Sequence, residues 1–324
     1  MRIVIIGGTG HVGSFLVPRL VRSGHSVVSL SRGERRPYVD DPAWEQVEQI
    51  SVDRTAEDAA HTFAGRVADL GPEVVIDMLC FTTTSAAQLV EGLRGRIGHL
   101  VLCGSIWRYG DSRRIPITEE NGAAPYGEYG TQKAAIAELL KRETQRGGLV
   151  TTSVHPGHIS GPGWAPINAL GNLDPGVWQA LAAGEELLVP GLGAELMHHV
   201  HADDVAQAFE LAVERRDAAA GEEFNVVAPS AMTVRGLAEA GAGWFGREAN
   251  LKHVSWEEFR ASTTPEYADQ SWSHLARSQY ASIDKARRLL GYSPAYEPDV
   301  AVEQAVQWLV EHDQLTVGAP LQSS

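Results

Sequence analysis

The sequence predicts an α/β protein with a doubly wound parallel sheet and a smaller lobe after it. Short, β-branched apolar runs alternate with longer amphipathic stretches through the first half of the chain. This order is typical of βαβ units, whose strands lie parallel in one sheet. A glycine-rich turn follows the first apolar run, at the place where such folds bind ligands.

The predicted strands are residues 3–6, 26–30, 47–52, 74–78, 100–103 and 150–154. Their continuous apolar character indicates strands that are covered on both faces. The helices predicted between them are residues 12–22, 59–70, 85–93 and 129–143. After about Gly161 the chain becomes rich in Gly, Pro and Asn and loses this alternation. We therefore expect a dinucleotide-binding domain at 1–165 and a substrate lobe mainly at 166–324, with the chain returning to the sheet at about 198–228.

The composition favours a small-molecule partner. The 324 residues carry a formal charge of −14, and no lysine or arginine run exceeds two residues. Electrostatic capture of nucleic acid or of an anionic membrane is therefore not expected. The two cysteines, Cys80 and Cys103, lack a CxxC spacing, which favours a reducing, cytoplasmic location without structural zinc. No apolar run approaches the ~18 residues of a membrane span.

The turn GGTGHVG places Gly7, Gly10 and Gly13 between the first strand and the first helix. Glycine allows the tight turn, the close approach of a pyrophosphate, and close packing of helix against strand. The amides at the helix N-terminus can then bind the phosphates. The alternative is an ordinary strand-to-helix turn. We interpret the turn as a dinucleotide site.

The end of the second strand predicts the choice of cofactor. Enzymes specific for NAD usually have an acidic residue there, whereas this chain has Ser31 and Arg32. These two, helped by Arg35 or Arg36, can bind a 2′-phosphate, so NADP is favoured over NAD; the alternative is a solvated arginine. Asp53, after the third strand, can accept from the adenine amino group or simply cap the next helix.

Tyr129 and Lys133 are four residues apart, so they lie on one face of a predicted helix. Ser105 follows the fifth strand. The sequence distance from Ser105 to Tyr129 and Lys133 can bring a hydroxyl, a phenol and an ammonium group together above a nicotinamide ring. Tyr126 has Gly130 at the matching position, so it is not the equivalent base.

These motifs resemble those of the extended short-chain dehydrogenases/reductases, the epimerase/dehydratase family. The glycine turn, Ser105 in SIWRYG, Tyr129 with Lys133, HPGHISGPG at 155–163, VHADDV at 200–205 and DKARRLLGYSP at 284–294 occur in family order. The match covers nearly the whole chain. Within the family, the sequence is most similar to the branch that includes chloroplast stem-loop-binding proteins.

The resemblance implies a Rossmann domain and hydride exchange between a secondary alcohol or its ketone and the nicotinamide. It implies that Tyr129 transfers the proton, Ser105 orients the reacting oxygen, and Lys133 holds the nicotinamide ribose and lowers the tyrosine pKa. It also implies a homodimer through the helices 85–93 and 129–143. The cofactor-binding positions are Gly7, Thr9, Gly10, His11, Val12, Gly13, Ser31, Arg32, Asp53, Leu79, Tyr129, Lys133, Pro156 and His158.

Departures from the family pattern bear on the substrate. Dehydratases and decarboxylases of the family have Asp or Glu in the two positions after the catalytic Ser or Thr, where this chain has Ile106 and Trp107. Nucleotide-sugar enzymes often have an arginine where this chain has Met197. We therefore expect a neutral or weakly charged polyhydroxylated substrate, such as a free sugar, a sugar lactone or a glycosylated natural product. Trp107, Trp164 and Asn168 are its candidate contacts.

Other functions stay open beside the reductase or dehydrogenase. A sugar or nucleotide-sugar epimerase would use the same three residues with NAD kept bound, and a non-catalytic dinucleotide- or RNA-binding protein would use the fold alone. A metal site at His198, His199 and His201 is not expected, because neighbouring residues of a strand point to opposite faces. His201 is interpreted as a packed structural histidine.

Overall fold

A computed structural model describes residues 1–322. Its larger part is a seven-stranded sheet in which all neighbouring strands are parallel. The spatial order of the strands is β11 (Glu223–Val226), β6 (Thr151–Pro156), β5 (His99–Cys103), β4 (Val74–Asp77), β1 (Arg2–Ile6), β2 (Ser26–Ser31) and β3 (Glu48–Ser51). The predicted doubly wound fold is confirmed, with all six predicted strands present.

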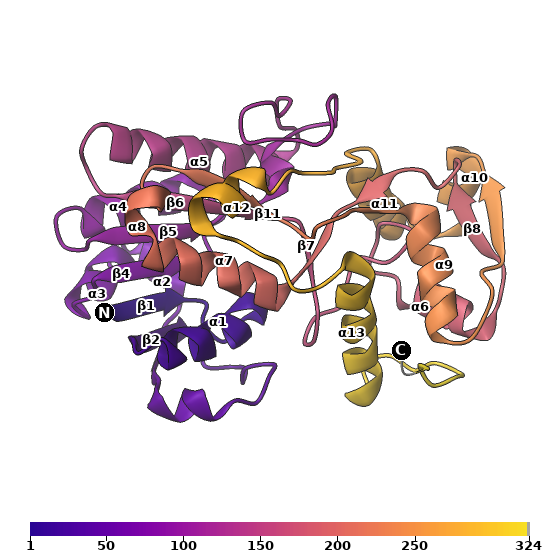
Figure 1. Cartoon of the computed structure of the whole chain (residues 1–324), viewed down its shortest axis with the longest axis horizontal. Coiled ribbons are helices and arrows are strands. Elements are labelled where there is room, and N and C mark those ends of the chain that lie inside the picture. Colours follow the sequence, from indigo (N-terminus) through magenta and orange to yellow (C-terminus); the bar gives the residue numbers. More distant parts are fainter. Residues whose placement is uncertain (323–324) are drawn as a thin grey trace.

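Helices cover both faces of this sheet (Figure 1). In β1, Ile3 and Ile5 point into one core with α1 (His11–Arg22), α7 (Ala202–Glu214) and α12 (Asp284–Leu290). Val4 and Ile6 point into the other core, with α3 (Phe63–Asp69), α4 (Thr83–Leu93) and α5 (Glu128–Gln145). Successive side chains of a strand alternate between faces, so the continuous apolar runs are explained by two buried faces.

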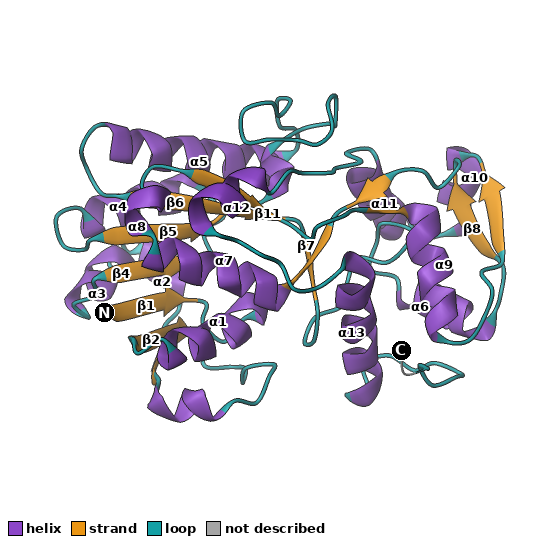
Figure 2. Ribbon diagram, in the orientation of Figure 1, coloured by secondary structure: helices purple, strands orange, loops and turns teal. Residues whose placement is uncertain are grey.

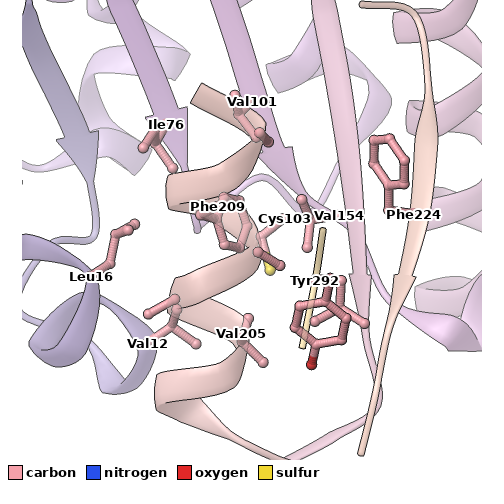
Figure 3. Packing of buried hydrophobic residues seen from close by; sticks show 14 of the residues in the cluster. Val12, Leu16, Ile76, Val101, Cys103, Val154, Val205, Phe209, Phe224 and Tyr292 are labelled. Carbon is pink, nitrogen blue, oxygen red and sulfur yellow. The ribbon is translucent and has the colours of Figure 1, made fainter. Parts of the chain in front are cut away.

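Figure 3 shows the first of these cores from close by. Phe209 of α7 lies among Ile76, Val101 and Cys103 of the central strands, and Val12 and Leu16 of α1 approach from the side. Tyr292, which follows α12, closes the core near β11, and its hydroxyl donates to the carbonyl oxygen of Val227 at 3.2 Å. The C-terminal part of the chain thus completes the N-terminal domain.

One predicted helix is wrong in extent. Residues 54–69 form two short helices, α2 (Arg54–Ala59) and α3, and only the last residue of α2 lies within the predicted range. Between them His61 has φ of +56°, which a continuous right-handed helix does not allow. The carboxylate of Asp53 accepts from the amide of Ala56 at 3.1 Å and so begins α2 well before residue 59.

The smaller lobe is built from segments that are distant in sequence (Figure 2). Its helices are α6 (Pro175–Ala183), α9 (Val234–Trp244), α10 (Trp256–Ser262), α11 (Pro265–Leu275) and α13 (Pro298–Glu311). Its strands pair as β8 (Leu187–Pro190) with β13 (Leu251–Val254) and β9 (Leu196–Met197) with β12 (Met232–Thr233). Buried residues from Ala169 to Leu315 form its own core.

Two short strands lie where the domain meets the lobe. β7 (His158–Ser160) pairs in parallel with β10 (His199–His201), outside the main sheet. From β10 the chain enters α7, the short helix α8 (Arg216–Ala219) and then β11, which pairs with β6 at the edge of the main sheet. Within residues 1–322, no helix is both long enough and apolar enough to cross a membrane.

Candidate active site

The glycine turn leaves the carboxyl end of β1 at the point where the strand order reverses, between β1 and β4. Gly7 has φ of +90°, and a Cβ there would lie 2.9 Å from Cγ of Leu79. A Cβ on Gly13 would lie 2.2 Å from the carbonyl oxygen of Gly8. Both positions therefore require glycine, one for backbone conformation and space and the other for the contact of α1 with the turn.

The N-terminus of α1 offers free donors. Its N-cap residue, Gly10, has no side chain to bind the first amides, and the amides of a first helical turn have no acceptor within the helix. Such a terminus binds phosphate well. Leu79, whose side chain is 42% exposed, and Val12 flank the turn. These residues fit the pyrophosphate of a dinucleotide.

His11 supplies only its backbone to this cradle. Its imidazole is buried, and Nε2 lies 3.2 Å from the carbonyl oxygen of Gly161. Burial lowers its pKa to about 4, so the ring is neutral near pH 7. The ring also contacts Trp164 at 5.4 Å between centroids. His11 thus ties the start of α1 to the segment that leads into the lobe, and Thr9 is buried beside it in the turn.

The loop after β2 is rich in exposed arginine. Arg32 and Glu34 form an ion pair at 3.2 Å, and both side chains are more than half exposed. The hydroxyl of Ser31 accepts from the amide of Gly33 at 3.2 Å, and Arg35 donates to the hydroxyl of Tyr38 at 3.1 Å. Asp53 has the capping role described above, which occupies one of its carboxylate oxygens.

Ser105 and Tyr129 lie on two different elements that meet over the carboxyl end of β5. Ser105 begins a short 3-10 helix (Ile106–Arg108), and its Oγ accepts from the amide of Trp107 at 3.1 Å. Tyr129 lies in the first turn of α5. The ring of Trp107 stands edge-on to that of Tyr129 at 5.9 Å. Two hydroxyl groups therefore face a common space.

Lys133 is buried one turn further along α5. Its Nζ donates to the carbonyl oxygens of Cys80 and Cys103, at 2.9 and 2.8 Å. An ammonium group has three donors, so one N–H stays available for a ligand hydroxyl. Phe81, half exposed, lies with its ring centroid 4.8 Å from the same Nζ. The two carbonyls fix the ammonium group at the ends of β4 and β5.

The pKa of Tyr129 is raised to about 12 in this structure. Burial is the main cause, and the hydroxyl of Ser105 acts in the opposite direction. The ammonium charge of Lys133 is held among backbone carbonyls beneath the phenol ring, 5.6 Å from the centroid, so the lowering of this pKa by Lys133 and a bound cofactor together stays a prediction. Tyr129 is a neutral phenol near pH 7.

One pocket joins the glycine turn to Ser105, Tyr129 and Lys133. Of the predicted site residues, those that line it are Gly7, Gly10, His11, Val12, Gly13, Leu79, Ser105, Tyr129, Lys133, Pro156 and Trp164. Ser31 lines a neighbouring hollow with Arg35 and Arg36. His158 is not among the residues that line the pocket. Its ring centroid lies 5.0 Å from that of His274.

The candidate substrate residues differ in position. Trp164 is 53% exposed at the pocket, and Trp107 borders Tyr129. Asn168 is a correction: it is fully buried, and its amide bonds Asn172, the carbonyl of Asp174 and the amide of Leu170. No polar atom of its side chain is left for a substrate.

The three histidines near β10 serve the fold. His198 Nδ1 accepts from the amide of Ala281 and His199 Nδ1 bonds Ser160. His201 accepts from the amide of Asp203 and stacks on Tyr296 at 3.9 Å. Between residues 1 and 322 there is no group of three or more His, Cys, Asp or Glu that could hold a metal ion.

Sequence reasoning missed two side chains near the site. Arg277 and Gln279 are both buried against the segments that carry Ser105 and Tyr129. They lie about 150 residues away in sequence, and no motif marks them. Phe81 was missed as well, although an aromatic residue in the loop that follows a buried strand was a usable signal.

The family model for the NAD-dependent epimerase/dehydratase family matches residues 3–227. This chain belongs to that family. Two of the relatives below are, by their names, a reductase and an epimerase. The geometry of the glycine turn and of Ser105, Tyr129 and Lys133 agrees with an enzyme of this kind.

The chain is 30% identical to 2'-dehydrokanamycin reductase of Streptomyces kanamyceticus over 64% of its length, and the match spans 56% of that relative. It is 27% identical to the chloroplast stem-loop binding protein of 41 kDa b of Arabidopsis thaliana, over 91% of this chain and 76% of the relative. It is 26% identical to UDP-glucose 4-epimerase of Mycolicibacterium smegmatis, over 96% and 98%.

Among solved structures, an epimerase of Methanothermobacter thermautotrophicus has a TM-score of 0.75 at 20% identity, covering 97% of this chain and 93% of that one. MoeE5 in complex with UDP-glucose and NAD has a TM-score of 0.72 at 20% identity, covering 96% and 99%. At this identity the likeness shows the shared fold.

Proposed function

We propose that this family member is an NADP-dependent oxidoreductase that interconverts a secondary alcohol and a ketone on a neutral, sugar-like metabolite. One observation carries the proposal: Ser105, Tyr129 and Lys133 share a pocket with the glycine turn. This arrangement supports proton transfer next to a nicotinamide. The two free, buried cysteines support a cytoplasmic location as part of the same proposal.

In the reducing direction Tyr129 is the proton donor. Its raised pKa keeps the phenol protonated near pH 7, so Oη can donate to a substrate carbonyl oxygen. When bound, the nicotinamide cofactor supplies the hydride to the carbonyl carbon, and the ketone becomes an alcohol. Ser105 Oγ donates to the same oxygen and orients it. The free N–H of Lys133 holds a ribose hydroxyl.

The oxidising direction reverses these roles. Tyr129 must then accept the alcohol proton, so its pKa must fall when ligands are bound. Two groups of the chain favour the phenolate: the hydroxyl of Ser105 donates to it, and the ammonium charge of Lys133 lies below its ring. Any positive charge on the bound cofactor adds to them.

Two cations near the pocket are already bonded within the chain, which supports a neutral substrate. Lys133 is bonded to two carbonyls, and Arg108 is paired with the carboxylate of Glu223. Met197 is fully buried in the lobe core, so this position does not present a side chain to a diphosphate. A nucleotide sugar would find no free cation at these three places.

A second function, epimerisation with retained NAD, has one observation in its favour. The UDP-glucose 4-epimerase of Mycolicibacterium smegmatis aligns over almost its full length. An epimerase oxidises and then reduces the same carbon, so it turns over without added cofactor. Purified protein that carries bound NAD and isomerises a sugar would favour this function over the reductase. RNA binding at physiological salt without any turnover would favour a binding protein.

The test of the main proposal is Tyr129→Phe. We expect kcat to fall by about 100-fold or more, because a general acid contributes about 10²–10⁴-fold, while the NADPH Kd stays within about threefold. The assay is NADPH absorbance on neutral sugars, aryl ketones and nucleotide sugars. Tyr126→Phe is the matched control, since it removes a phenol hydroxyl three residues earlier. Equal turnover by Tyr129→Phe and wild type would sink the assignment.

A further inference from the structure

Arg277 is a buried cation that lies between two aromatic rings. It follows α11 and is 3% exposed. Its guanidinium carbon is 3.9 Å from the ring centroid of Trp107 and 4.0 Å from that of Tyr126. A planar guanidinium group fits such a space because it can stack on both rings.

No carboxylate compensates this charge by direct contact within residues 1–322. Nη2 donates to the carbonyl oxygen of Tyr126 at 3.1 Å and Nη1 to that of Ser273 at 2.5 Å. Nε is buried without a partner in the same part of the chain. Burial lowers the pKa of Arg277, and the charge of Asp111 opposes this. Burying an unpaired cation is costly, so an apolar side chain would fill this space at lower cost.

The two rings belong to the segments that carry the two catalytic hydroxyls. The amide of Trp107 donates to Oγ of Ser105 at 3.1 Å, and its ring contacts that of Tyr129. On the other side Tyr126 is followed by Gly127, the N-cap of α5, with φ of +71°. Tyr129 is the second residue of that helix. A single guanidinium group therefore touches both segments.

Gln279 reinforces one side of this arrangement. Its Nε2 donates to the carbonyl oxygens of Ile106 and Tyr109 at 3.0 and 3.2 Å. These residues lie in and just after the short 3-10 helix that Ser105 begins. Gln279 thus holds the loop that carries Ser105 by hydrogen bonds to its backbone. Arg277 links the same loop to the start of α5.

We propose that Arg277 is a positioning residue, which sets the separation of the Ser105 and Tyr129 hydroxyls by stacking between Trp107 and Tyr126. The inference rests on the proposed function, in which both hydroxyls bind one substrate oxygen. Proton transfer depends steeply on this geometry, and a displacement of about 1 Å can cost about 100-fold in rate. Arg277 does not line the pocket of the glycine turn, so we expect its replacement to change the NADPH Kd little.

The experiment compares Arg277→Ala and Arg277→Lys with wild type on the carbonyl compound that wild type reduces fastest. We expect Arg277→Ala to lower kcat by about 100-fold, with KM and the NADPH Kd each changed by less than about threefold. Lysine keeps the charge but lacks the planar guanidinium group that stacks on both rings. We therefore expect the kcat of Arg277→Lys to be little higher than that of Arg277→Ala. Guanidinium chloride at low, non-denaturing concentration should restore part of the kcat of Arg277→Ala, whereas methylammonium should not.

The control is Arg235→Ala, which removes an exposed arginine of α9 in the lobe that pairs with Glu239. It should leave kcat unchanged with or without guanidinium. The proposal is overturned by wild-type kcat in Arg277→Ala, or by a low kcat that guanidinium does not raise. If Arg277→Ala does not fold, Arg277→Lys with a wild-type kcat overturns it.

If the wild type reduces no carbonyl compound, the proposed function is contradicted. The positioning role of Arg277 is then tested by a measurement that does not need activity. Crystal structures of wild type and Arg277→Lys then give the distance between Ser105 Oγ and Tyr129 Oη. A change of about 1 Å supports the positioning role, and an unchanged distance overturns it.

Discussion

Lys133 shows how a single residue can serve both the fold and the chemistry. Its ammonium group is buried against the carbonyls of Cys80 and Cys103. Charged donors to carbonyls form stronger hydrogen bonds than neutral ones, which offsets part of the cost of burial. The same bonds leave one N–H of an ammonium group that lines the pocket with Tyr129. Without these two acceptors, the ammonium group would be mobile, because the lysine side chain has four rotatable bonds.

Arg32 is where we expect cofactor preference to be set. Wild type should bind NADP(H) at least tenfold more tightly than NAD(H), a difference of about 1.4 kcal/mol, and Arg32→Asp should remove or reverse that preference. Glu34 partly neutralises Arg32, so Glu34→Gln should strengthen it. Titrations of both cofactors by fluorescence measure this, with Arg142→Asp as a control. A wild type that prefers NAD(H), or an Arg32→Asp variant with unchanged preference, contradicts it.

The site residues that the sequence predicted are those whose role depends on local structure. Gly13 needs only the turn before its helix, and Tyr129 and Lys133 need only one helical face. Asn168 was misassigned because its partners, Asn172 and Asp174, decide its role through a compact loop that polar composition does not reveal. Arg277 could not be found, since its position beside Trp107 depends on the packing of the lobe.

At the scale of elements, the contact of α1 with the glycine turn leaves no space for a side chain at Gly13. Gly13→Ala should destabilise the protein by more than about 2 kcal/mol and weaken NADPH binding, because its Cβ meets the backbone of Gly8. Gly65→Ala in α3 is the matched control, with no atom within 4 Å of the added Cβ. It should be neutral or stabilise by up to about 1 kcal/mol.

Urea unfolding of both variants and a cofactor titration measure the difference. Equal unfolding midpoints for Gly13→Ala and Gly65→Ala would show that the turn can relax.

The helix predicted at 59–70 shows what the hydrophobic pattern alone does not reveal. Apolar spacing indicated one helix, but the Asp53 cap starts a helix earlier and the left-handed His61 separates it from α3. Neither feature changes the hydrophobic pattern.

At the scale of the whole molecule, buried neutral histidines make stability depend on pH. Burial lowers the pKa of His11, His99, His198 and His201 to about 4, against about 6.5 in the unfolded chain. The unfolded state therefore binds more protons between these values. Stability is complete above about pH 6.5 and is lost as the pH falls toward 4, by about 2 kcal/mol per histidine at pH 5.

Asp204 opposes this trend, since burial raises its pKa to about 6. Its stabilising contribution is present at low pH and is lost as the pH rises from about 4 to 6. Four histidines outweigh one carboxyl, so the urea midpoint should fall steeply from pH 7 to pH 5. His99→Gln should flatten the curve, whereas His253→Gln, at an exposed position, should not. A midpoint constant from pH 7 to pH 5 contradicts this account.

We also propose a homodimer through the outer faces of α4 and α5. Ile136 and Leu140 of α5 point into the sheet core, so they are not available for a partner. The outer faces form a hollow lined by Ala87, Glu91, Ala135 and Glu138 among others. Sedimentation at micromolar concentration should give a species near twice 35.0 kDa, and Ala135→Arg should shift it to the monomer. A wild-type monomer at this concentration refutes the dimer.

The lobe core has a consequence for how the chain matures on the ribosome. Val302, Val306 and Leu309 of α13 complete a core that begins at Ala169, and β11 must be made before the sheet has its outer strand. During synthesis, the N-terminal strands can pair early, since domains tend to fold in the order in which they emerge. The lobe, by contrast, exposes apolar surface until α13 has left the ribosome and can pack. Proteolysis of stalled nascent chains ending at residue 297 should therefore cut the lobe and spare the first five strands.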